Sequence, residues 1–227
     1  MAKKITLFIG LTVAVGAVFL ADSLAQDRSF RDLAAYVCYF ALALLTSSMK
    51  VRLPGITGTI SVNFLFVLIA IAVFTFSETV VLASVACVVQ CLWKPRRRPK
   101  LIQVSFNVAT LAISSGIAHR AAHVLAGSQG HNSVVLLALA ACFYFTTNTL
   151  LVSGVLSLVE SKPLLDVWKQ CYLWSFPYYL VGAVIAGLMV VSGQTMGWAA
   201  PLLILPLMFM VYTFYRTFVQ RLAGMSR

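Results

Sequence analysis

Charged residues are scarce in this 227-residue sequence: they make up 10% of it, and only six are acidic. Hydrophobic residues make up 61%. This balance excludes an ordinary soluble domain and is typical of proteins that cross a membrane several times. The connections between the apolar stretches are too short to hold a soluble domain. We therefore expect a single integral membrane domain over residues 1–227, surrounded by the lipid bilayer.

Recognisable catalytic motifs are also missing. The sequence contains no P-loop, no HExxH, no GxSxG and no pair of carboxylates inside an apolar stretch. The long apolar runs lack the alternation of polar residues that marks the strands of a membrane barrel. Helices are the remaining structure that satisfies every backbone group in lipid. The sequence thus favours a helical membrane protein that is not an enzyme.

Eight apolar stretches come close to the length that a helix needs to cross hydrocarbon. They predict an all-α fold, a polytopic transmembrane bundle of about eight spans. The first stretch also has the charged, apolar and small-residue regions of a secretory signal, and its cleavage would leave seven spans. The predicted spans are 5–21, 33–48, 58–76, 79–93, 101–119, 133–158, 171–191 and 196–215.

The basic residues indicate an orientation. With eight spans, only Arg28, Arg31 and Arg120 of the 17 Lys and Arg residues fall on the side opposite the others. The positive-inside rule then places both termini in the cytoplasm. The run KPRRRPK at 94–100 would anchor two helices to anionic headgroups. The run is brief, bounded by proline and free of aromatic residues, so we expect no nucleic-acid partner.

Metal sites and disulfides are weakly indicated. Five cysteines, an odd number within or beside apolar spans, argue against a disulfide framework. Cys87 and Cys91 share a helix face, but two thiols alone make a poor metal site, and we expect packing residues.

A second polar group maps to the outer face, where two histidines and a carboxylate could bind zinc or copper or move protons. Arg120 opposes a cation there, and Glu78 is a candidate ion-pair partner for it. We therefore expect a wetted helix end with no tightly held metal and no cofactor. The group comprises Glu78, His119, Arg120, His123 and His131.

Two Ser-x-Asn segments, Ser61-Val62-Asn63 and Ser105-Phe106-Asn107, open two spans that run in the same direction. Each asparagine would lie roughly 9 Å from the inner helix end. The preceding LPGITGT, residues 53–59, predicts either a bent or re-entrant opening or an ordinary interfacial turn. We hypothesise that these segments face one another.

Polar side chains in lipid need partners, so the polar residues of the inner half predict either plain interhelical hydrogen bonds or a ligand pocket. An amide both donates and accepts, which suits a small neutral or zwitterionic ligand or a lipid. No span carries a central Arg or Lys for an anionic group. The candidate ligand-binding residues are Ser61, Asn63, Gln90, Gln103, Ser105, Asn107 and Asn148.

Three segments between residues 53 and 125, LPGITGTISVNFLF, FSETVVLASVACVVQ and SFNVATLAISSGIAH, resemble the membrane-embedded sensor regions that precede GGDEF or HD-type signalling domains in bacteria. The resemblance continues to about residue 190. A looser similarity links the chain to the substrate-binding S-components of energy-coupling-factor transporters.

These resemblances imply a ligand-binding module in the inner membrane of a bacterium, either a sensor input or the substrate-capturing subunit of a transporter. A stand-alone carrier or lipid translocator stays open, and an intramembrane enzyme less so. Because the sequence ends at Arg227 without an output domain, we expect any signal to pass to a partner membrane or signalling protein.

Overall fold

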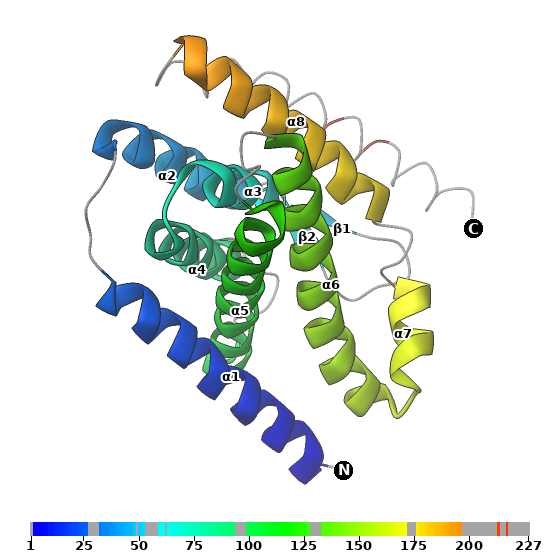
Figure 1. Ribbon diagram of the computed structural model, residues 1–227. Coiled ribbons are helices and arrows are strands. Elements are labelled where there is room, and N and C mark those ends of the chain that lie inside the picture. The colour runs from blue at the N-terminus through cyan, green and yellow to red at the C-terminus, as the bar shows by residue number, and fades with distance from the viewer. Residues whose placement is uncertain are drawn as a thin grey trace.

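The chain folds into a helical bundle, as the sequence predicts (Figure 1). Among the residues that the structure describes, four helices are long and apolar enough to cross a membrane, and three others are apolar but shorter. This computed structural model describes residues 2–26, 32–48, 50–52, 59–61, 63–93, 99–127, 133–171 and 176–196, together with Thr213 and Thr217. The predicted span 196–215 therefore lies almost wholly outside the described residues.

The long helices form the frame of the bundle, and shorter elements fill it. The long ones are α1 (Ala2–Ala25), α5 (Leu101–Ala126), α6 (Ser133–Glu160) and α8 (Phe176–Met196). The shorter ones are α2 (Leu33–Ser47), α3 (Phe64–Val73), α4 (Phe76–Leu92) and α7 (Leu164–Cys171), with two strands, β1 (Lys50–Arg52) and β2 (Thr59–Ser61).

The predicted span 58–76 differs from the structure, because it is a helix only from Phe64 onward. Its first part is β2, which pairs antiparallel with β1 so that Lys50 lies opposite Ser61. The β-branched Thr59 and Ile60 suit a strand, and average hydropathy does not separate an apolar strand from an apolar helix. The first Ser-x-Asn segment therefore begins in a strand, and only its Asn63 lies at the start of a helix. The connecting residues 53–58 lie outside the described part.

Helix α3 is the innermost element of the bundle. Every residue from Phe64 to Ile71 is at most 4% exposed. With ten residues α3 is about 15 Å long, half the hydrocarbon thickness. A turn at Phe74 and Thr75 then reverses the chain into α4. In contrast, only 11% of the apolar window of α1 is buried, against 50% for α5, so α1 lies at the periphery.

Helices α1 and α5 run side by side in the same direction. Phe8 and Phe106 contact each other near the first halves of the two helices, with ring centroids 6.5 Å apart. Asp22 and Arg120 pair near their ends. Helix α6 runs the opposite way, because Gly154 in its second half lies against the Phe8 ring. The directions of α1, α5 and α6 therefore agree with the alternating directions of the predicted spans.

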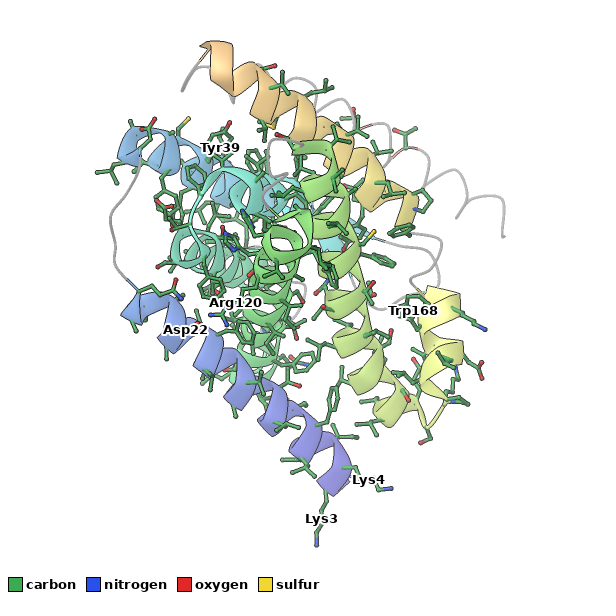
Figure 2. All side chains as sticks on the ribbon, in the orientation of Figure 1. Lys3, Lys4, Asp22, Tyr39, Arg120 and Trp168 are labelled. Carbon is green, nitrogen blue, oxygen red and sulfur yellow. The ribbon has the colours of Figure 1, made fainter. Side chains whose placement is uncertain are left out.

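The two ends of the bundle differ in charge. Figure 2 shows Lys3 and Lys4 at one end of α1, and Asp22 toward the other end, directed at Arg120. Following the predicted orientation, we call the lysine end inner and the Asp22–Arg120 end outer. Helix α3 runs outward and α4 inward, because their shared turn contacts α5 near Arg120.

Candidate functional site

Three polar side chains from three helices meet at the inner end of the α3–α4 hairpin. Asn63, at the N-cap position of α3, is 3% exposed. Its side-chain amide donates to Ser47 Oγ at 3.3 Å and to Gln90 Oε1 at 3.4 Å. The structure thus brings together two of the predicted site residues, Asn63 and Gln90, and adds Ser47 at the end of α2.

The second asparagine contacts the neighbouring residue of α4. Asn107 donates from Nδ2 to Cys91 Sγ at 3.4 Å, and its side chain is exposed. Because Gln90 and Cys91 are adjacent, Asn63 and Asn107 lie at the same level of the bundle. Consecutive residues point about 100° apart on a helix, so the asparagines approach α4 from different sides. We call Ser47, Asn63, Gln90, Cys91 and Asn107 the inner amide layer.

Asn63 directs its amide to other helices rather than to its own. Its side chain makes no capping hydrogen bond to α3, although its backbone carbonyl accepts from Phe66 N at 2.9 Å. The next residue, Phe64, packs its ring on Tyr178 and Tyr179 of α8, with centroids 5.0 and 4.8 Å away. This aromatic contact fixes the start of α3, and with it the position of the Asn63 amide.

The other predicted site residues have different surroundings. Gln103 is exposed, and its Oε1 accepts from the backbone N–H of Lys100, which caps the start of α5. Ser105 is exposed on the same helix. Asn148 is half-buried in α6, one turn beyond the buried Tyr144. Ser61 lies in β2, and its side chain is outside the described part.

Charged and aromatic side chains gather at the outer end. The Arg120 guanidinium pairs with Asp22 of α1 and lies 4.3 Å from the centre of the Phe76 ring. The structure therefore corrects the sequence-based ion pair between Arg120 and Glu78. Glu78 instead caps the start of α4. Its Oε2 accepts hydrogen bonds from the backbone N–H of Thr75 at 2.8 Å and from the Thr75 hydroxyl at 2.9 Å.

The two outer histidines of α5 stack on each other with ring centroids 4.3 Å apart. His119 Nε2 lies 3.3 Å from the carbonyl oxygen of Phe74, so Nε2 carries the donated hydrogen. His123 Nδ1 donates to the carbonyl of His119 at 2.8 Å. Within the described residues, no group of three or more His, Cys, Asp or Glu side chains is placed to hold a metal ion.

Comparison with known families assigns the chain to a family of membrane proteins. The sequence profile of MASE9, a family of membrane-associated sensor domains, matches residues 8–216. The chain belongs to this family. No curated protein and no solved structure gives a significant match. The MASE9 match supports the predicted membrane sensor region and a multi-pass membrane protein. The similarities to GGDEF or HD-type sensor regions and to S-components stay predictions.

Two members of the inner amide layer of this MASE9 chain were not among the predicted site residues. Ser47 ends an apolar helix at the inner side, and the same reasoning about depth that selected Asn63 would have found it. Cys91 was interpreted as a packing residue. Within the described residues Cys91 is not part of a disulfide, nor are Cys38, Cys87 and Cys142. Cys87 lies one turn before Cys91 on α4.

Proposed function

We propose that this MASE9 chain is a sensor input module that binds a small neutral or zwitterionic molecule, or a lipid of that kind, in the inner amide layer. The observation that carries the proposal is the convergence of Ser47, Asn63 and Gln90 from three helices around one buried amide. Asn107, held by Cys91 at the same level, extends the polar surface toward α5.

The chemistry of the layer suits an uncharged ligand. Amides, a hydroxyl and a thiol supply both donors and acceptors without a net charge. The start of α3 points into the layer, and the partial positive charge of a helix N-terminus favours a carboxylate in zwitterionic molecules. Asn63 is the natural contact, since a ligand amide or carboxylate could replace Ser47 or Gln90 as its partner.

Helix α3 offers a route from the layer to an output. It is buried on all sides and packs against α2, α4, α5, α6 and α8. A ligand that changes the partners of Asn63 would therefore shift an element that touches five neighbours. We propose that the shift is read by a partner membrane or signalling protein, or by a domain of the GGDEF or HD type, at the inner face of a bacterial inner membrane.

Thermal unfolding in lipid nanodiscs tests the ligand site. The purified chain is screened against a panel of neutral and zwitterionic amino acids, polyols and phosphatidylethanolamine. At a concentration of 100 Kd a bound compound stabilises by about 2.7 kcal/mol. We expect such a compound to stabilise the wild type and Gln103→Leu, a matched glutamine outside the layer, to the same extent, and Gln90→Leu less, because the layer then lacks one of its amides.

Two results would contradict this proposal: no stabilising compound in the panel, or equal stabilisation of the Gln90→Leu variant. Liposomes that hold the purified chain alone provide a further comparison. Transport of the same compound into them would favour the stand-alone carrier over the sensor.

The orientation is tested by cysteine labelling. In a chain without its natural cysteines, Pro95→Cys marks the basic loop and Ser128→Cys marks the loop after α5. A membrane-impermeant maleimide added to intact cells is expected to label Ser128→Cys and to spare Pro95→Cys, because the basic residues gather with Pro95. Labelling of both positions from outside would refute the proposed cytoplasmic termini.

A further inference from the structure

Helix α7 is held on the bundle mainly through one tryptophan. Trp168 Nε1 donates to Thr149 Oγ1 of α6 at 2.9 Å, and its ring centroid lies 6.3 Å from that of Phe145 on the same helix (Figure 2). The neighbouring Val167 is 3% exposed, whereas Leu165 is exposed. A helix of eight residues is too short to be stable alone, so α7 depends on its packing against α6.

A series of aromatic rings connects the Trp168 contact to the inner amide layer. The ring centroid of Phe145 lies 5.1 Å from that of Tyr179 on α8, and Tyr179 lies 4.8 Å from Phe64 on α3. Phe64 directly follows Asn63, whose amide joins Ser47 and Gln90. The rings of Phe145, Tyr179 and Phe64 are each at most 4% exposed. Because a protein interior is close-packed, a shift of one of these rings displaces the next.

The Phe64 ring is also confined by a glycine of α8. A Cβ added at Gly182 would overlap this ring, so the ring lies directly on the α8 backbone. Gly182 comes three residues after Tyr179, which places both on the same side of α8. Helix α8 therefore contacts the Phe64 ring at two adjacent turns and leaves no space there to absorb a movement of the ring.

We infer that α7 is the output element of this sensor, and that a molecule bound in the inner amide layer controls how firmly Trp168 is held against α6. The inference rests on the proposed function of the layer. A change in the partners of Asn63 moves the start of α3 and the Phe64 ring with it. Phe64 then displaces Tyr179 and Phe145 in turn. Phe145 forms one side of the Trp168 contact, so its displacement loosens α7.

Helix α7 is placed to pass this change to the inner face. It follows the inner end of α6 after the turn at residues 161–163. Ser157 Oγ donates to the carbonyl of Lys162 at 2.6 Å, which holds the start of α7 to α6. Release at Trp168 therefore frees the second half of α7 while its start stays attached. Asp166 and Lys169 are exposed on α7, and a partner protein on the inner side can read their displacement.

Fluorescence of Trp168 tests the connection in the full chain without any ligand. Phenylalanine replaces the other three tryptophans, and quenching by iodide is measured in nanodiscs. We expect Phe64→Leu to shift the Trp168 emission to longer wavelength and to increase its quenching, because the Trp168 contact loosens. The replaced tryptophans are Trp93, Trp174 and Trp198.

Phe74→Leu is the matched control, since Phe74 is a buried ring at the other end of α3. Each of the two phenylalanines contacts two tyrosine rings, but those of Phe74 belong to α2 and lie outside the series that leads to Trp168. We expect Phe74→Leu to leave the Trp168 fluorescence unchanged. Equal changes in the two variants, or no change in Phe64→Leu, overturn the inference.

A second pair of variants displaces the Phe64 ring without shortening it, and decides the question where Phe64→Leu fails to fold. Gly182→Ala places a methyl group where the ring lies. Gly187→Ala on the same helix meets Leu137 Cδ1 at 3.5 Å, an ordinary contact distance. We expect Gly182→Ala alone to change the quenching of Trp168. No change in Gly182→Ala, or the same change in both variants, contradicts the inference.

A compound from the thermal screen then separates this inference from the proposed function. It should change the quenching of Trp168, and change it less in Tyr179→Leu, where the series of rings is interrupted. A compound that stabilises the chain but leaves Trp168 unchanged overturns the role of α7, and the ligand site stands. If no compound stabilises the chain, the proposed function fails, while the two pairs of variants still decide whether α3 and α7 are connected.

Discussion

Gly16→Leu is expected to lower the free energy of unfolding by about 3 kcal/mol, at the upper end of the cost of overpacking. Helix α1 packs closely against α5 at this glycine, where an added Cβ would meet both Cβ and Cα of Ala109. The Ala109 backbone cannot move aside as a flexible side chain can. The leucine must therefore push α1 away from α5, and the Phe8–Phe106 contact would be lost with it.

Gly10→Leu is the matched control on the same helix, because no atom of the described residues lies within 4 Å of a Cβ at Gly10. Both substitutions gain the same helix propensity, so the difference between them measures packing alone. Thermal unfolding of both variants in nanodiscs provides the comparison. If Gly16→Leu is as stable as Gly10→Leu, the close contact between α1 and α5 is wrong.

Asn63→Leu is expected to cost about 1–3 kcal/mol of stability, and to abolish stabilisation by any compound that binds the inner amide layer. The leucine leaves Ser47 Oγ and Gln90 Oε1 without the amide that now bonds to them. Since Asn63 does not cap α3 with its side chain, the loss reports the contacts between helices.

Asn107→Leu is the natural comparison, because both are asparagines at one level of the bundle. Asn107 is exposed and its acceptor is a thiol, which is a weak hydrogen-bond acceptor, so we expect a clearly smaller loss of stability. Chemical or thermal unfolding in the same lipid mixture measures both variants. Equal losses would show that burial of Asn63 does not distinguish the two positions.

The predicted ligand site combined sound and unsound steps. Depth was inferred from the position of each asparagine along its span, and the contacts with Gln90 and Cys91 place both at one level. The sequence-based picture of two facing helix starts, however, rested on a helix that reached back to residue 58. In the structure Ser61 belongs to a strand, and each asparagine contacts α4 instead of the other.

The outer end shows the same limit for charges. Sequence spacing brought Glu78, His119 and Arg120 to one face, where the structure also has them. It did not reveal that Asp22, at the end of α1, forms the ion pair with Arg120, because spacing along the sequence does not show that positions 22 and 120 lie close in space. That pairing leaves Glu78 to the capping of α4.

The sequence by itself determined that this protein is a helical membrane bundle, because a chain with 61% hydrophobic residues must satisfy its backbone within each apolar segment. It also selected the polar residues worth following, since each polar group in lipid needs a partner. Only the tertiary structure decided which partners they have. Partner choice depends on helix direction, rotation and length, and the short α3, with its turn at Phe74 and Thr75, set these for both polar sites.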